Sequence, residues 1–132
     1  MPKESPSSNG PASLKVLVVE DNIDGAETLA AILRAMGHDT RIAFNGYAGL
    51  VIADEFRPDV VLLDIGLPGL DGYDVARTLR ERRKDGLVII AVSGYGHQSA
   101  RERARETGID HFLVKPVDLK SLTKFLAAIQ QK

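Results

Sequence analysis

Residues 60–69 read VVLLDIGLPG, and this stretch decides the fold class of the 132-residue chain. An apolar run from Val60 to Leu63 ends at Asp64, and glycine and proline follow it. Such a run is typical of a strand buried on both faces of a parallel sheet, and the Gly/Pro cluster ends it. A carboxylate at the carboxyl end of such a strand lies where open α/β sheets bind their ligands. The stretch therefore predicts a parallel α/β sheet with Asp64 at its functional edge.

Strand-like runs alternate with amphipathic helical segments along the rest of the chain. We expect strands at residues 15–20, 39–44, 59–64, 87–92 and 111–115. Units of this kind with short connections favour a parallel sheet with helices on both faces. Length and unit number predict a flavodoxin-like, doubly wound (βα)5 fold of the α/β class, with a five-stranded parallel sheet in the order 2-1-3-4-5. In that order the first and third strands flank the point where ligands bind.

The spacing of apolar residues indicates how firmly each helix is held. The first helix is expected to bury a stripe made of Leu29, Ile32, Leu33 and Met36, and to stop at Gly37. The last is expected to bury Leu119, Leu122, Leu126 and Ile129. The fourth, at about residues 98–106, has only Ala100 and Ala104 as apolar anchors. We therefore expect the fourth helix to move most easily.

Bulk properties exclude several classes of protein. The chain is 44% hydrophobic and 27% charged, which is the composition of one soluble globular domain. A formal net charge of −1 gives no general preference for nucleic acid or for an anionic membrane. There is no cysteine, which excludes disulfides and thiolate metal sites and fits a cytoplasmic location. No apolar stretch approaches the roughly 18 residues of a membrane span, so we expect no membrane contact.

Two segments are interpreted as solvated or unstructured. Residues 1–12 are polar and contain proline and serine, so we expect a disordered tail or linker, which leaves residues 13–132 as the domain. A basic stretch contains Arg77, Arg80, Arg82, Arg83 and Lys84. Because acidic residues interrupt it, we interpret it as a solvated helix face and not as a nucleic-acid patch.

Carboxylates are expected to converge at the functional edge of the sheet. Glu20 and Asp21 follow the first strand, and Asp64 ends the third. These charges would repel one another, and a hard cation with oxygen ligands is the usual remedy. Ser93 and Lys115 follow two later strands and complete a set suited to phosphoryl chemistry.

These residues resemble the landmarks of the receiver domains of two-component response regulators. The resemblance covers about residues 14–129 and rests on Glu20-Asp21, Asp64, Ser93, Phe112 and Lys115-Pro116, in that order. It implies that Asp64 accepts a phosphoryl group from a phosphohistidine of a sensor histidine kinase or histidine phosphotransfer domain. It also implies that Asp21, Asp64 and the backbone carbonyl of Gly66 bind Mg²⁺, with Glu20 acting through water.

The resemblance further implies a switch. Lys115 would pair with one phosphoryl oxygen, and Ser93 would donate a hydrogen bond to another. Phe112 would then turn into the space that the loop of Ser93 leaves. The face formed by the fourth helix, fifth strand and fifth helix would be remodelled for a downstream protein partner. Such a domain assists its own phosphorylation but is a signalling module and not an enzyme, and the Lys115–Pro116 peptide bond is expected to be cis.

Structural interpretations of the same residues stay open at this point. Glu20-Asp21 could cap the first helix at Asn22, and Ser93 could belong to a plain turn. Phe112 could be an ordinary core aromatic, and Lys115 a snorkelling surface residue. All of the landmarks fall at strand ends in the expected order, which favours the functional interpretation.

Other functions fit parts of the pattern less well. A Mg²⁺-dependent aspartyl phosphatase usually has Asp-x-Asp after its first strand, whereas this chain has Glu20-Asp21-Asn22. A flavin carrier needs a Ser/Thr/Gly-rich phosphate loop there, and acidic residues would repel the flavin phosphate. A degenerate docking receiver would not need the complete set. A phosphoryl sink or relay without conformational output remains an alternative.

The chain is expected to be either a stand-alone regulator or the receiver segment of a larger protein. Residues 64–73, DIGLPGLDGY, resemble receivers fused to hybrid sensor kinases, which favours the second explanation.

Overall fold

The computed structural model describes residues 13–66, 71–94 and 98–130, so the expected tail at residues 1–12 lies outside the described part. Strands and helices alternate throughout: β1 (Lys15–Val19), α1 (Ile23–Ala35), β2 (Asp39–Ala43), α2 (Gly46–Phe56), β3 (Val60–Asp64), α3 (Gly72–Arg82), β4 (Val88–Ser93), α4 (Gln98–Glu106), β5 (His111–Val114) and α5 (Leu119–Gln130). Each strand lies within one residue of its predicted bounds.

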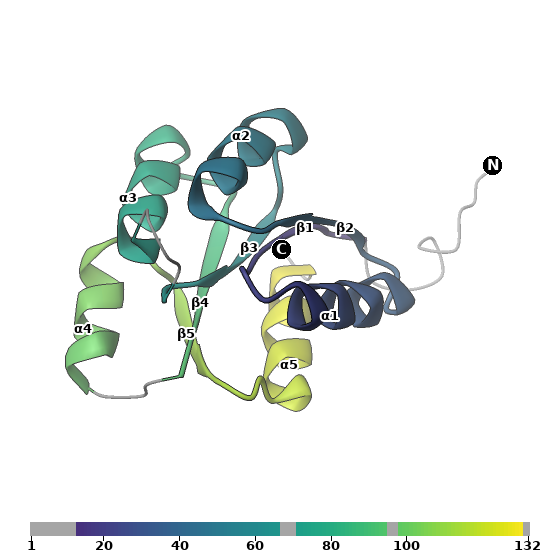
Figure 1. Cartoon of the computed structure of the whole chain (residues 1–132). Coiled ribbons are helices and arrows are strands. Elements are labelled where there is room, and N and C mark those ends of the chain that lie inside the picture. Colours follow the sequence, from purple (N-terminus) through teal and green to yellow (C-terminus); the bar gives the residue numbers. More distant parts are fainter. Residues whose placement is uncertain (1–12, 67–70, 95–97, 131–132) are drawn as a thin grey trace.

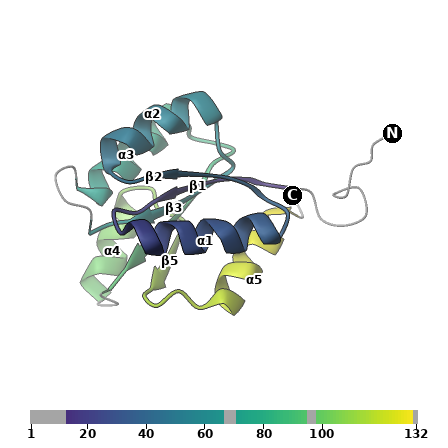
Figure 2. The ribbon, with the colours of Figure 1, turned by 45° about the vertical axis from the view of Figure 1, so that its right-hand side comes forward.

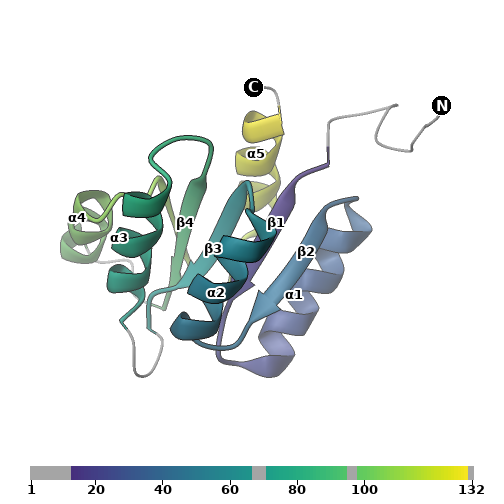
Figure 3. The same ribbon diagram turned by 90° about the horizontal axis from the view of Figure 1, so that it is seen from above.

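The sheet has the predicted topology. Its strands are parallel and follow the order β2-β1-β3-β4-β5, as in the doubly wound fold that the sequence predicts (Figures 1 and 3). Val16 to Val19 of β1 pair with Val60 to Leu63 of β3. The residues that follow these two strands are therefore brought together at one edge of the sheet.

Helices cover both faces of the sheet and bury the hydrophobic runs. One layer contains α1 and α5, and the other contains α2, α3 and α4 (Figures 1 and 2). Every residue of β3 is buried, with Val61 and Leu63 in the core beneath α2 and α3. Val60 and Leu62 belong to the core beneath α1 and α5. Burial on both faces explains why this strand has no alternation of polar and apolar residues.

Each apolar stripe is confirmed at its centre and wrong at one of its ends. Leu33, Leu122 and Leu126 are fully buried, as predicted. Met36 caps the carboxyl end of α1 and is 40% exposed, while Leu119 begins α5 and is 47% exposed. Terminal turns extend past the neighbouring layer, so helical spacing alone overestimates their burial.

Few side chains are buried in residues 102–106, the part of α4 whose side chains are described, and the predicted anchor Ala100 lies outside that part. Among the side chains described for α4, residues 102–106, Ala104 is buried and the others are exposed. The Arg103 guanidinium lies 4.1 Å from the centre of the Tyr73 ring and 3.3 Å from Asp71 Oδ2. An exposed ion pair contributes little stability, so this half of the helix is held mainly by Ala104.

The interpretation of the basic stretch is wrong for two of its residues. Arg77, Arg82 and Lys84 are exposed, but Arg80 and Arg83 are partly buried. Arg83 donates hydrogen bonds to the carbonyls of Pro58 and Gly86, and burial lowers the pKa of its guanidinium. Both arginines donate hydrogen bonds to backbone carbonyl groups of the loops near the end of α3. These carbonyl groups are distant in the sequence or lie in irregular segments, so charge patterning does not predict them.

In the described ranges, none of the helices combines the length and the apolar character that crossing a membrane requires.

Candidate functional site

An acidic cluster lies at the carboxyl edge of the sheet. Glu20 and Asp21 follow β1, and Asp64 ends β3. One carboxylate oxygen of each residue lies within 4.8 Å of the others. Asp64 is only 8% exposed, whereas Asp21 is exposed and Glu20 is intermediate. Three oxygen donors at this separation, with one side open to solvent, form a set that can hold a hard divalent cation.

Backbone and side-chain donors hold the Asp64 carboxylate. The Gly66 N–H donates to Oδ1 at 2.9 Å, and Lys115 Nζ lies 3.2 Å from Oδ2. The start of α3 packs directly behind this strand end, because a Cβ added to Gly72 would lie 2.3 Å from Ile65 Cα and 2.9 Å from Asp64 O. Only glycine allows α3 to begin so close to the strand that carries Asp64.

Lys115 bridges two of the carboxylates. Its Nζ lies 2.8 Å from Glu20 Oε1 as well as 3.2 Å from Asp64 Oδ2. The Lys115 N–H donates to the carbonyl of Ser93 at 2.7 Å, and the Lys115–Pro116 peptide bond is cis, as the resemblance implied. Partial burial lowers the pKa of Lys115, but its hydrogen bonds and ion pairs with Glu20 and Asp64 raise it by more, so the ammonium is charged.

Glu20 is fixed from two directions. Its Oε2 accepts the N–H of Asn22 at 3.1 Å, and its own N–H donates to the Ala43 carbonyl at 3.0 Å. Burial, together with the neighbouring Asp64, raises the pKa of this carboxyl against the opposing effects of Lys115 and Asn22. The cap of α1 is the Asn22 side chain itself, which accepts the Gly25 N–H at 2.7 Å. The Glu20 and Asp21 side chains are therefore not needed as the cap.

Ser93 and Phe112 lie on the neighbouring strands β4 and β5. Ser93 ends β4, is 6% exposed and pairs with Val114 in the sheet. Phe112 is half-buried and packs against the core beneath α2, α3 and α4. The aromatic side chain thus contributes to the core of the layer that contains α4.

Sequence reasoning missed a groove next to the acidic cluster. A cavity of about 760 Å³ reaches from Asp64 and Glu20 along α1. One wall is formed by Thr28, Leu29 and Ile32 of α1, and the other by Pro116 and Val117 of the β5–α5 connection together with Leu119 of α5. Most of these side chains are apolar, and the groove ends at the carboxylates. The exposure of Leu119 follows from its place in this wall. The two walls lie about 90 residues apart in the chain, so only the tertiary structure brings them together.

The family model for the response regulator receiver domain matches residues 16–127. This chain belongs to the response regulator receiver family. Among curated relatives, the receiver is 37% identical over 108 residues to the DNA-binding response regulator MtrA of Mycobacterium tuberculosis, covering 82% of this chain and 46% of that protein. It is 32% identical over 116 residues to the protein PilH of Pseudomonas aeruginosa, covering 87% of this chain and 96% of PilH. The chain thus spans about half the length of MtrA and nearly all of PilH.

Solved structures agree with this assignment. The receiver superposes on a putative response regulator from Chloroflexus aurantiacus with a TM-score of 0.82 at 29% identity, covering 91% of this chain and 99% of that one. It superposes on the chemotaxis protein CheY4 of Vibrio cholerae with a TM-score of 0.83 at 25% identity, covering 89% and 99%. The fold class and the family that the sequence indicated are confirmed.

Proposed function

We propose that this receiver accepts a phosphoryl group on Asp64 from a phosphohistidine of a sensor histidine kinase or of a histidine phosphotransfer domain. The observation that carries the proposal is the single carboxylate at the end of β3, held by the Gly66 N–H and by Lys115 beside two further acids. An Asp64 oxygen attacks phosphorus, an O–P bond forms and the P–N bond breaks. The electron pair of that bond stays on the imidazole, which takes up a proton.

The acidic cluster fits Mg²⁺, because its described donors are oxygens and carry excess negative charge. By analogy with the family, Asp21, Asp64 and the Gly66 carbonyl would hold the ion, with Glu20 acting through water. When bound, the ion stabilises negative charge on the transferring group. Glu20 would also keep Lys115 at the edge of the site, since the Glu20–Lys115 ion pair is the shorter of the two that Lys115 makes.

Lys115 would then pair with a phosphoryl oxygen. Its Nζ already lies 3.2 Å from Asp64 Oδ2, so a group attached to that carboxylate comes within reach of the ammonium. Ser93, at the end of the adjacent strand, would donate its hydroxyl to another phosphoryl oxygen. Movement of Ser93 and reorientation of Phe112 would alter the α4–β5–α5 face, where we place the downstream protein partner. A lightly anchored α4 supports this choice.

The groove along α1 supports a protein as phosphodonor. It is largely apolar, it is open, and it ends at Asp64. A partner that presents apolar side chains next to its phosphohistidine could bury them in the groove while the phosphoryl group faces the carboxylate. Burial of apolar surface would supply affinity without blocking the site.

The proposal is tested with phosphoramidate, a small donor that contains a P–N bond. Wild-type protein with Mg²⁺ should gain the mass of one phosphoryl group. Asp64→Asn should gain none, whereas Asp74→Asn, which alters an exposed acid on α3 that pairs with Arg77, should behave as wild type. Equal labelling of the Asp64→Asn and wild-type proteins would contradict the proposal.

A further inference from the structure

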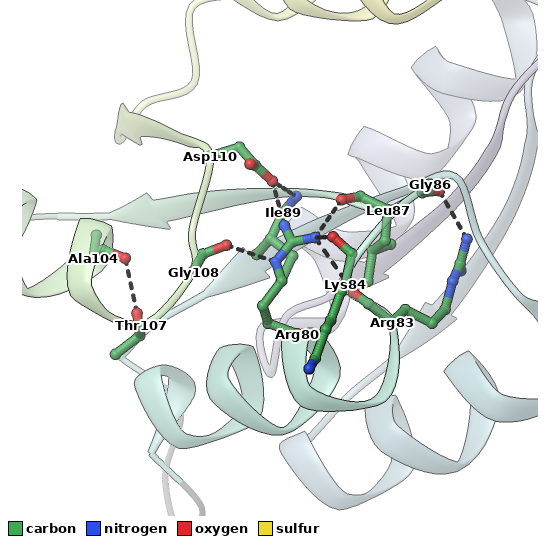
Figure 4. Close-up of polar contacts among 10 residues, drawn as sticks. All are labelled: Arg80, Arg83, Lys84, Gly86, Leu87, Ile89, Ala104, Thr107, Gly108 and Asp110. Carbon is green, nitrogen blue, oxygen red and sulfur yellow. Dashed lines mark hydrogen bonds and ion pairs between the residues drawn. The ribbon is translucent and has the colours of Figure 1, made fainter.

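Arg80 joins three segments at the end of the sheet opposite to the phosphoacceptor. Its Nη1 donates to the Leu87 carbonyl at 2.9 Å and lies 3.4 Å from the carbonyls of Arg83 and Lys84 (Figure 4). Its Nε donates to the Gly108 carbonyl at 3.1 Å. The Arg80 side chain is only 21% exposed. One guanidinium therefore connects the end of α3, the α3–β4 loop and the turn that leaves α4.

Asp110 completes this junction from the other side. Its Oδ2 accepts from Arg80 Nη2 at 2.5 Å and from the Ile89 N–H at 2.8 Å. The Asp110 N–H also donates to the Ile89 carbonyl at 2.8 Å. The backbone and the side chain of Asp110 are thus both fixed to β4, and the same carboxylate is fixed to α3.

Gly108 brings the turn into contact with Arg80. Its φ is +87°, and a Cβ there would lie 2.8 Å from Arg80 Cγ. Thr107 closes the end of α4 by donating its hydroxyl to the Ala104 carbonyl at 2.9 Å (Figure 4). The turn from Thr107 to Asp110 is consequently held by packing as well as by hydrogen bonds. Any residue other than glycine at position 108 would displace the Arg80 side chain.

Along the part of α4 whose side chains are described, residues 102–106, and the turn that follows it, the contacts are therefore unequal. Towards its middle, the described contacts to α3 are the exposed Arg103 ion pair and the stacking of Arg103 on Tyr73. At its carboxyl end, the Arg80–Gly108–Asp110 junction is partly buried and uses charge-assisted hydrogen bonds, which are stronger. A helix held in this way moves most easily at its amino-terminal end.

We propose that Arg80 makes the 107–110 turn a fixed pivot, so that α4 moves as a lever about its carboxyl end when the domain switches. The inference rests on the proposed function for the trigger, while the pivot itself is a property of the fold. It places the largest displacement near the amino-terminal end of α4, which follows Ser93 in the chain. It keeps the start of β5 in register with β4 while α4 moves.

Hydrogen exchange tests the pivot, with beryllofluoride and Mg²⁺ as a stand-in for the phosphoryl group. In wild type, the amides of 107–110 should exchange at least about tenfold more slowly than those of 100–104, and beryllofluoride should change exchange in α4 while leaving the amides of 107–110 unchanged. In Arg80→Met, which keeps the apolar stem, the 107–110 amides should exchange about tenfold faster, and the beryllofluoride response should spread into them. Arg82→Met, which removes an exposed ion pair with Asp54, is the matched control and should leave both patterns unchanged.

The outcomes separate this inference from the proposed function. If wild-type residues 107–110 exchange as fast as residues 100–104, the pivot is refuted whether or not beryllofluoride binds. A second outcome is that beryllofluoride has no effect on wild type, while residues 107–110 still exchange more slowly than residues 100–104 and lose this protection in Arg80→Met. The proposed phosphoryl-driven switch would then be refuted, and the fixed carboxyl end of α4 would be supported. If Arg80→Met does not fold, Arg80→Lys, which keeps the charge near Asp110 but lacks the fork of donors, should show the same loss of protection at Gly108. Unchanged protection in that variant would refute the role of Arg80.

Discussion

Gly72 offers a test of how closely the phosphoacceptor strand and α3 are coupled. A Cβ at this position would lie 2.3 Å from Ile65 Cα, 2.9 Å from the Asp64 carbonyl oxygen and 3.0 Å from the Ile65 carbonyl carbon. Non-bonded carbon atoms prefer about 3.5–4.0 Å, so Gly72→Ala requires a shift of more than about 1 Å. All three neighbours are backbone atoms, which cannot move away by changing a rotamer.

The expected effect has two parts. Overpacking of this kind lowers the free energy of unfolding by about 1–3 kcal/mol, or more where the backbone has to move. The shift also displaces Asp64 from the Gly66 N–H and from Lys115, and a misplacement of about 1 Å in a reacting group can reduce a rate by about a hundredfold. We therefore expect Gly72→Ala to be both less stable and much slower to accept phosphoryl from phosphoramidate.

Gly49→Ala is the matched control within a helix. A Cβ at Gly49 would meet Val19 Cγ2 at 3.1 Å, and that side chain can adjust. Its stability should stay within about 1 kcal/mol of wild type, because alanine favours the interior of a helix by up to about that amount. Urea unfolding and single-turnover phosphorylation measure the two effects. A Gly72→Ala protein with wild-type stability and a wild-type rate would refute the reasoning.

Three further predictions concern the metal, a buried histidine and the turn after α4. Mg²⁺ at about 100 times its dissociation constant should add about 2.7 kcal/mol to the free energy of unfolding of wild type and nothing to Asp21→Ala, and equal effects in thermal melts would contradict the metal assignment. Burial lowers the pKa of His38, whose Nδ1 accepts the Leu14 N–H at 3.1 Å, so the unfolded chain binds the proton more readily. The stability that neutral His38 provides should be complete above pH ~6.5 and should decline by at most about 1.4 kcal/mol per pH unit below it. The free energy of unfolding of wild type is compared with that of His38→Asn, and a difference that stays the same above and below pH ~6.5 would contradict this prediction. Gly108→Ala should lower the free energy of unfolding by about 1–3 kcal/mol more than Gly37→Ala in urea melts, because both glycines have positive φ but only a Cβ at Gly108 would clash with Arg80. Equal losses of stability in the two variants would show that the contact with Arg80 does not matter.

The sheet could be predicted because its information is local. The run from Val60 to Leu63 predicts a strand buried on both faces, and the acid that follows must then lie at the carboxyl edge. The same logic predicts from the sequence that Glu20 and Asp64 lie together. Once the strand order was given, the meeting of these carboxylates needed no knowledge of side-chain packing.

The contacts that depend on side-chain packing could not be predicted. Lys115 shares its ammonium between Glu20 and Asp64, and Glu20 lies 95 residues away in the chain. Arg80 resembled a solvated charge because its partners are carbonyls of loops, which leave no pattern in the sequence. Leu119 continued an apolar stripe, but its helix begins there and its side chain lines a groove. In each case the deciding partner belongs to another element of the fold.

The central claim is that Asp64 carries the phosphoryl group, and trapping the modified residue tests it most directly. After incubation with phosphoramidate and Mg²⁺, borohydride reduces an aspartyl phosphate to homoserine, and peptide mass spectrometry locates the change. We expect homoserine at position 64 and unmodified acids at positions 20 and 21. Homoserine at another acidic residue, or none in a folded protein that binds Mg²⁺, would contradict the account.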